Sequence, residues 1–206
     1  MRFTRFVVLL GMTLLAGCSI LPKAESPRVY LLPAAPAARP ATTTSVTWTL
    51  RIATPTAPRA LDSARIAVVP EAHTISVYAG ARWADSVPHL VRDRLADAFR
   101  DTGRVRAIGT DDGNLGADYE LDGSLAAFQT EYVDGKPTVV IRFDAILAGT
   151  RKHQMVGARR FEVREPVDGK AVPQVVEAFG RAMDILAREV TAWTLEQAVP
   201  PGGTSG

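Results

Sequence analysis

The one cysteine of the 206-residue chain, Cys18, follows two small residues, Ala16 and Gly17. A thiolate is the side-chain nucleophile that takes up a lipid as a thioether, and small residues before it fit a narrow peptidase site. This spacing predicts lipid attachment at Cys18 and cleavage of the bond before it. The alternative is a secreted protein with an unrelated buried cysteine. Because there is no second cysteine, an intrachain disulfide is excluded.

The residues before the cysteine have the layout of a secretory signal. Arg2 and Arg5 precede an apolar run over residues 6–15, which is too short to cross a hydrocarbon core of about 30 Å as a helix. The following Leu15-Ala16-Gly17-Cys18 resembles the lipobox of bacterial lipoproteins, in which the cysteine becomes the first mature residue. We therefore expect residues 1–17 to be a cleaved signal peptide.

The residue after the cysteine bears on which membrane holds the anchor. An aspartate there would resemble an inner-membrane retention signal, whereas this chain has Ser19. We therefore expect lipid-anchored attachment to the outer membrane, with the protein facing the periplasm. Several acyl chains, each contributing about 0.8 kcal/mol per buried CH₂, would hold the protein in that bilayer.

Catalytic and metal-binding patterns are scarce. The sequence has no nucleophile elbow, glycine-rich phosphate loop or paired histidines, and His73, His89 and His153 are far apart. We interpret these histidines as surface residues, with a catalytic role as the alternative. Asp111-Asp112-Gly113-Asn114 lacks the distal acidic ligand of a calcium loop, which favours a polar turn. The sequence predicts no enzyme, no metal and no cofactor.

The charges give no reason to expect nucleic acid as a partner. Loss of Arg2 and Arg5 with the signal leaves the basic residues equal in number to the 22 acidic ones. A local basic cluster around one expected hairpin has two interpretations, a charged sheet edge or a contact with anionic headgroups or an acidic partner. Its members are Arg151, Lys152, His153, Arg159 and Arg160.

The most distinctive cluster is Arg82-Trp83-Ala84-Asp85, directly before an expected helix. In a structural interpretation, Trp83 packs over the helix start and Asp85 or Ser86 caps the helix. In a functional interpretation, the cluster contacts a partner. The two interpretations are compatible, and the candidate partner contacts are Tyr78, Arg82, Trp83 and Asp85.

Hydrophobic periodicity indicates the elements that position these residues. Helices are expected from Ser86 to Gly103 and over 172–193, and Asp134-Gly135 predicts a hairpin turn. Residues 79–85 are expected to form a loop. The order of elements predicts an α/β fold, a mixed sheet of about five strands with two main helices packed on it. The strand-like runs behind this prediction are 65–69, which is continuously apolar, 74–78, 105–108, and the alternating runs 119–127, 139–147 and 155–164.

Composition divides the chain into four parts. Residues 1–17 are the signal peptide, and 18–45 hold the lipidated cysteine and a Pro/Ala/Thr-rich tether with a short strand near 28–32. A single α/β domain is expected over 46–198. Residues 199–206 have nothing to bury and are expected to be a disordered tail.

The order of several motifs resembles one known family, the ABC-type transport auxiliary lipoproteins, which include paraquat-inducible protein C. The resemblance covers nearly the whole mature chain and is most specific at Arg-Trp-Ala-Asp. The motifs that carry it are the lipobox, Val29-Tyr30-Leu31-Leu32, Ser63-Ala64-Arg65-Ile66-Ala67-Val68, Tyr78-Ala79-Gly80-Ala81-Arg82-Trp83-Ala84-Asp85, Ala117-Asp118-Tyr119-Glu120-Leu121 and Phe128.

The resemblance implies a function that the residues alone do not show. It implies an outer-membrane tether that works with a mammalian-cell-entry (MCE) domain protein and an ABC ATPase–permease pair in lipid transport. It also implies an anticodon-binding-domain-like layering and no catalysis. A stand-alone periplasmic lipid carrier remains the alternative, with an enzyme as a third. Homo-oligomerisation stays open.

Overall fold

Long alternating runs of apolar residues form three antiparallel strands on one side of the sheet. In the computed structural model these are β6 (Tyr119–Val133), β7 (Lys136–Gly149) and β8 (Gln154–Pro166), which pair in that order. The turn between β6 and β7 has positive φ at Asp134 and Gly135, as the hairpin prediction requires. The structure describes residues 26–36, 45–113, 116–151 and 154–198, so Cys18, the signal peptide and the 199–206 tail lie outside the described residues.

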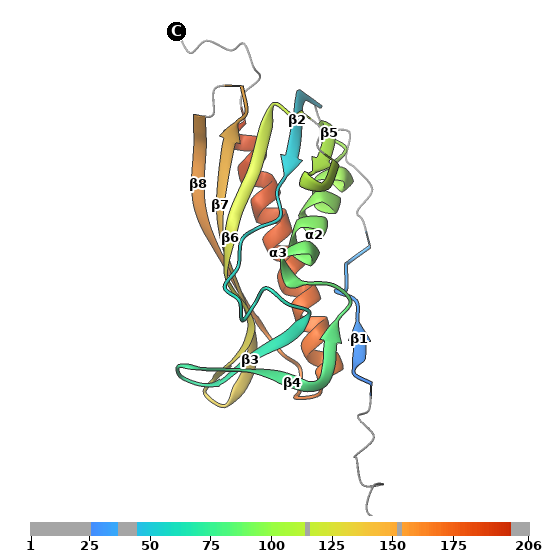
Figure 1. The fold of residues 1–206 in the computed structure, drawn as a ribbon, viewed down its shortest axis with the longest axis vertical. Helices are drawn as coiled ribbons and strands as arrows, with labels where there is room; N and C mark the ends of the chain where they lie inside the picture. Colours follow the sequence, from blue (N-terminus) through green and yellow to red (C-terminus); the bar gives the residue numbers. More distant parts are fainter. Residues whose placement is uncertain (1–25, 37–44, 114–115, 152–153, 199–206) are drawn as a thin grey trace, which may run out of the picture.

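The other edge of β6 is shared by two groups of strands (Figure 1). Its first residues, Tyr119–Leu121, pair in parallel with β2 (Val46–Ile52), which pairs with β5 (Val105–Thr110). Its later residues, Gln129–Glu131, pair in parallel with β3 (Arg65–Glu71). β3 is followed in the sheet by β4 (Thr74–Trp83) and then β1 (Arg28–Tyr30). A short 3-10 helix, η1 (Asp111–Gly113), follows β5.

The mixed α/β class is confirmed, but the described sheet has eight strands rather than the expected five. The additional pairings are parallel contacts between segments far apart in the sequence, which leave no local signal such as a turn. The expected loop 79–85 is also wrong, because β4 continues to Trp83. There, Ala81–Trp83 form a parallel ladder with β1. Gly80, at φ 66°, supplies the left-handed backbone where β4 bulges and bends between its two partners.

Both main helices form where their periodicity predicts them, and they pack on the same face of the sheet (Figure 1). α2 (Val87–Thr102) ends at Gly103, whose φ of 62° is the left-handed C-terminal conformation that favours glycine. α3 (Val172–Gln197) begins with a proline in its first turn. The Gln174 side chain accepts a hydrogen bond from the Ala171 backbone N–H and closes that helix start.

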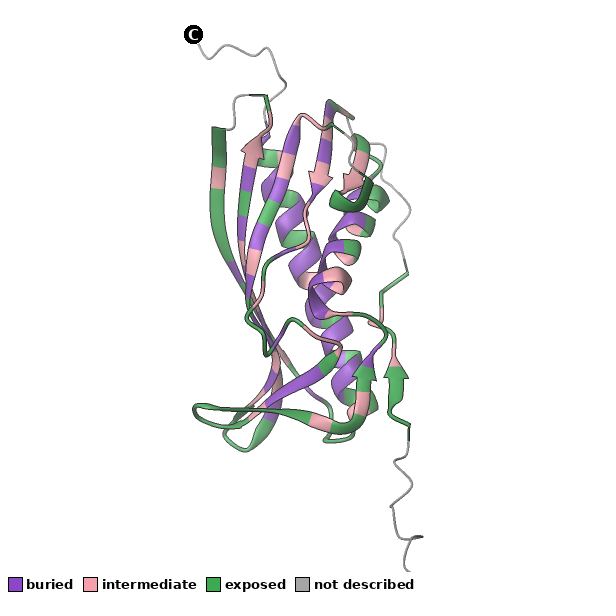
Figure 2. Cartoon of the chain, viewed as in Figure 1, coloured by how far each residue is buried: buried purple, intermediate pink, exposed green. Residues whose placement is uncertain are grey.

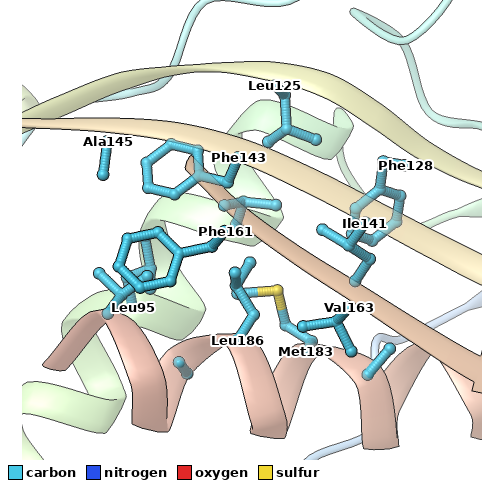
Figure 3. Close-up of a cluster of buried hydrophobic side chains, with 14 of the residues drawn as sticks. Leu95, Leu125, Phe128, Ile141, Phe143, Ala145, Phe161, Val163, Met183 and Leu186 are labelled. Carbon is cyan, nitrogen blue, oxygen red and sulfur yellow. The ribbon is translucent and has the colours of Figure 1, made fainter. Parts of the chain in front are cut away.

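The core lies between the helices and the sheet, as the buried residues on the facing surfaces show (Figures 2 and 3). Phe143 and Phe161 from adjacent strands meet Met183 and Leu186 of α3, and all four side chains are at most 2% exposed. Burial of such side chains, at about 25 cal/mol per Å², is the main favourable contribution to folding. These aromatic and long aliphatic side chains fill the layer.

Residues 26–36, which the sequence places in the tether, lie against the domain. The Tyr30 carbonyl accepts a hydrogen bond from the Ala84 N–H at 2.8 Å. Further on, Pro33 crosses α3 at Gly180, where a Cβ would stand 2.8 Å from the Pro33 Cβ. Only a glycine permits this approach without a shift of the segment.

A carboxylate of α3 binds both the same segment and an arginine of α2. Asp184 of α3 accepts a hydrogen bond from the Ala35 backbone N–H at 3.0 Å and forms an ion pair with Arg94 of α2. The contact holds the segment beside the helix pair. Residues 28–35 are thus a fixed part of the domain surface.

Candidate interaction site at the junction of β4 and α2

Strand alternation places the first two residues of the Arg-Trp-Ala-Asp cluster on opposite faces of the sheet. Trp83 points into the layer between sheet and helices and is 0% exposed, whereas Arg82 points to the opposite face and is exposed. The backbone N–H of Trp83 donates a hydrogen bond to the Ala64 carbonyl at 2.7 Å, which fixes the end of β4 beside β3. The indole is therefore a core group that positions its neighbours and does not itself reach a partner.

Trp83 belongs to a three-ring aromatic group. Its ring meets Phe179 edge-on at 5.3 Å between centroids and Phe128 at 6.2 Å, and those two phenylalanines stack at 4.8 Å. Such pairs contribute about 0.5–1.5 kcal/mol each beyond their burial. Because the rings come from β4, β6 and α3, the group joins the junction to the sheet and to the long helix. Among the described residues, the indole N–H has no hydrogen-bond partner.

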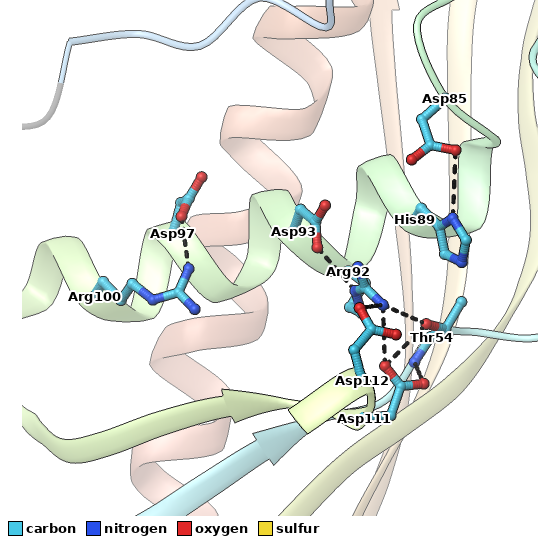
Figure 4. A network of polar contacts seen from close by, with 9 residues as sticks. All are labelled: Thr54, Asp85, His89, Arg92, Asp93, Asp97, Arg100, Asp111 and Asp112. Atoms are coloured by element: carbon cyan, nitrogen blue, oxygen red, sulfur yellow. Dashed lines mark hydrogen bonds and ion pairs between the residues drawn. The ribbon is translucent and has the colours of Figure 1, made fainter. Parts of the chain in front are cut away.

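Asp85 lies exposed at the start of α2 (Figure 4). One of its oxygens accepts a hydrogen bond from the Ser86 N–H at 2.6 Å and lies 3.3 Å from His89 Nδ1. The hydrogen bond from the Ser86 N–H is the main cause that holds the pKa of the Asp85 carboxyl below its ordinary value, and His89 lowers it further. The expected side-chain cap is not formed, because Ser86 occupies the N-cap position without a cap hydrogen bond. Asp85 is thus an exposed, ionised carboxylate next to a histidine.

Tyr78 is half-buried and lies apart from the other three candidates, on the part of β4 before the bend at Gly80. Burial raises the pKa of its phenol. Its hydroxyl is buried with that of Thr130, and the interaction with Thr130 partly offsets the effect of burial on this pKa. The structure therefore leaves Arg82 and Asp85 as the exposed members of the predicted contact.

A network around Arg92 of α2 was not predicted from the sequence (Figure 4). Its guanidinium is 8% exposed and contacts Asp93, Asp111 and Asp112 at 2.7–3.1 Å, and it also donates to the Thr54 hydroxyl. The network joins α2, η1 and the segment after β2. The Asp111-Asp112 pair after a strand was the one available sequence signal, and here it serves as a counter-ion for arginine.

The predicted basic cluster is dispersed into separate contacts. Arg160 forms two hydrogen bonds with Asp144, Arg151 pairs with Asp118 at 3.0 Å, and Arg159 lies over the Phe161 ring. Lys152 and His153 lie outside the described residues. Arg160 belongs to a row of paired charges on the outer face of the sheet, which is the arrangement of a solvated surface.

Histidines and carboxylates of the described ranges do not form a metal site. No group of three or more histidine, cysteine, aspartate or glutamate side chains in residues 26–36, 45–113, 116–151 and 154–198 is arranged to hold an ion. His73 stands in the β3–β4 turn with φ 68°, far along β4 from His89 at the start of α2. None of the helices described is long and apolar enough to cross a membrane.

Comparison with known proteins places the β4–α2 junction inside a family-wide match. The model of the family described as "ABC-type transport auxiliary lipoprotein component" matches residues 30–191. The chain belongs to this family. The match includes β4 and α2 entirely and most of α3. This transport auxiliary lipoprotein family is not a known enzyme family, and membership makes the chain a membrane-associated lipoprotein.

Solved structures agree with this membership. The auxiliary lipoprotein is similar to protein XCC0632 of Xanthomonas campestris, with a TM-score of 0.75 and 28% identity over 82% of this chain and 96% of that chain. A second, uncharacterised protein shares the fold, with a TM-score of 0.65, 16% identity and coverage of 82% and 99%.

A curated relative extends well beyond the matched part. An uncharacterised protein of Bradyrhizobium diazoefficiens is 32% identical over 148 residues, which cover 71% of this chain. The match spans only 39% of that longer relative.

Proposed function

We propose that this auxiliary lipoprotein is anchored through Cys18 in the outer membrane, faces the periplasm, and tethers an MCE-type ABC lipid transport system. The family match over residues 30–191 is the observation that carries the proposal. The signal layout and the single cysteine after Ala16-Gly17 support the anchor. In this role the domain binds protein partners, an MCE-domain protein with its ABC ATPase and permease, and performs no catalysis.

The partner contact is proposed to lie at the junction of β4 and α2. Arg82 and Asp85 are exposed there, while the buried Trp83 between them fixes the backbone from which both project. A cation and an anion three residues apart, on a backbone that is already ordered, can recognise a complementary pair with little loss of entropy on binding.

The layered core favours a tether over a stand-alone lipid carrier. An acyl chain bound between helices and sheet would occupy the space that Phe143, Phe161 and Met183 fill (Figure 3). Forcing extra groups into such a packed core typically costs about 1–3 kcal/mol. A tether needs no such opening, because it acts through its surface.

Reversing one charge at the junction tests the proposed contact. We expect Asp85→Arg to lower recovery of the MCE-domain protein about tenfold, because it places a cation where the partner meets an anion. The matched control is Asp97→Arg, farther along the chain within α2, since the Asp85 and Asp97 side chains are both 57% exposed and each lies beside one basic residue.

The measurement is co-purification of the MCE-domain protein with each acylated variant from detergent-solubilised envelope, normalised to the bait. Thermal unfolding of both variants confirms that the fold is intact. Equal recovery with Asp85→Arg and Asp97→Arg would remove Asp85 from the proposed contact.

A further inference from the structure

The first strand of the domain, β1, is close in sequence to Cys18, the proposed site of lipid attachment. Arg28, the first residue of β1, is ten residues from Cys18. Ten residues span at most about 35 Å even when fully extended. Because Pro33 and Ala35 are held on α3, the proline-rich residues after them connect β1 to β2 and add nothing to this reach.

The point of attachment selects one end of the molecule, which we call the anchor end and define by the start of β1 and the hairpin ends 71–77 and 131–136. Figure 1 shows these segments together with the start of α3, at the bottom of the view. α3 runs from there for 26 residues, or about 39 Å. The opposite end therefore lies farther from β1 than the tether can reach.

Much of the anchor end is coloured as exposed in Figure 2, and several of its exposed residues are apolar. Ile75 and Val133, at the ends of the two hairpins, are 48% and 45% exposed. The hairpins lie side by side because β3 pairs with β6 through Val69 and Glu131. The exposed apolar residues of this end are Val29, Ile75, Val77, Tyr132 and Val133.

The charges at the start of β1 and at the two turns are balanced and do not form a cationic surface. Glu71 and Asp134 are acidic, Arg28 and Lys136 are basic, and all four are exposed. A surface of this composition attaches to a bilayer through its apolar side chains rather than through anionic headgroups.

We propose that the anchor end rests on the lipid bilayer, with the ends of the β3–β4 and β6–β7 hairpins in the interfacial region. The membrane, rather than a protein, contacts this apolar surface because the short tether keeps the anchor end next to the bilayer. The domain then stands with its long axis away from the bilayer and presents its opposite end to the periplasm. This inference depends on anchoring through Cys18, as proposed above.

The test uses the mature, acylated lipoprotein in vesicles of phosphatidylethanolamine and phosphatidylglycerol. Because lipidation occupies Cys18, a cysteine introduced elsewhere is the sole free thiol and can carry an environment-sensitive fluorophore. Labels at Ile75→Cys and Val133→Cys report on the two hairpins. Gln154→Cys, exposed where β8 begins at the opposite end, is the matched control.

We expect a blue-shifted emission and quenching by nitroxide-labelled lipid at positions 75 and 133, and neither at 154. Vesicles of phosphatidylcholine alone should give the same result, because the contact is apolar. Emission at 75 and 133 equal to that at 154 would overturn the inference. A blue shift that appears only when MCE-domain protein is added would also overturn it, in favour of a protein docking site.

The mass of the N-terminal peptide separates this inference from the proposed anchor. If Cys18 is acylated but the fluorophores at positions 75 and 133 show no blue shift or quenching, only the proposed contact of the anchor end with the bilayer is contradicted. An unmodified Cys18 contradicts the anchoring on which both proposals depend.

Discussion

Replacing Trp83 with alanine is expected to lower the free energy of unfolding by about 3–5 kcal/mol. The indole is 0% exposed and meets Phe179 and Phe128 edge-on, so its removal leaves a cavity among three elements. The indole N–H has no hydrogen-bond partner among the described residues, so the substitution removes no such bond there. The cost therefore comes from lost packing. It is to be measured by urea unfolding of the purified protein.

The neighbouring residue provides the control for this substitution. Arg82→Ala changes an exposed side chain that forms no ion pair with another described residue, and should shift the unfolding free energy by no more than about 0.5 kcal/mol. A similar loss of stability in both variants would show that the junction responds to any substitution. In that case Trp83 would not have the central packing role assigned to it.

Replacing Cys18 with serine is expected to abolish membrane attachment. A serine hydroxyl is not ionised at neutral pH and does not replace the thiolate as the acceptor of the lipid. The lipid on Cys18 is the proposed route of attachment, so its loss should release the protein from the membrane. The measurement is fractionation of the envelope together with the mass of the N-terminal peptide.

The adjacent position gives a matched control. Ser19→Ala leaves the cysteine in place and should be acylated and sediment with the outer membrane as the unsubstituted protein does. A Cys18→Ser protein that sediments with the outer membrane as fully as Ser19→Ala would contradict anchoring through this residue.

Local signals predicted the elements with short-range causes. The Asp134-Gly135 pair predicted the β6–β7 turn because both residues tolerate the positive φ that a tight hairpin needs. Gly103 predicted the end of α2 for the same reason. The apolar period from Val172 onward predicted α3 because eight apolar residues at helical spacing indicate a single buried face.

Long-range contacts were not predictable in the same way. The pairing of β1 with Ala81–Trp83 joins segments about fifty residues apart, and parallel strands have no turn residues to reveal them. Gly180 gave no sign of its contact with Pro33, because a glycine within a helix does not indicate what lies over it. The sequence predicted a short strand near 28–32 within the tether, but not that this strand pairs with β4 and lies on the domain.

The candidate site was only partly predictable. Arg82, Trp83 and Asp85 were identified from their residue types, but the expected loop concealed the alternation that places Arg82 and Trp83 on opposite faces. Arg92 was missed because a buried arginine depends on acidic partners that the fold brings from η1. Neither the opposite orientation of Arg82 and Trp83 nor the ion pairs of Arg92 can be predicted from the adjacent residues in the sequence.

We propose above that this auxiliary lipoprotein tethers an MCE-type transporter through its surface. The most direct measurement is capture of the acylated, unsubstituted protein from gently solubilised envelope, followed by mass spectrometry of everything bound to it. We expect an MCE-domain protein together with its ABC ATPase and permease, at a constant ratio over repeated preparations. Capture without any MCE-domain protein, under conditions that keep other envelope complexes intact, would contradict the proposed function.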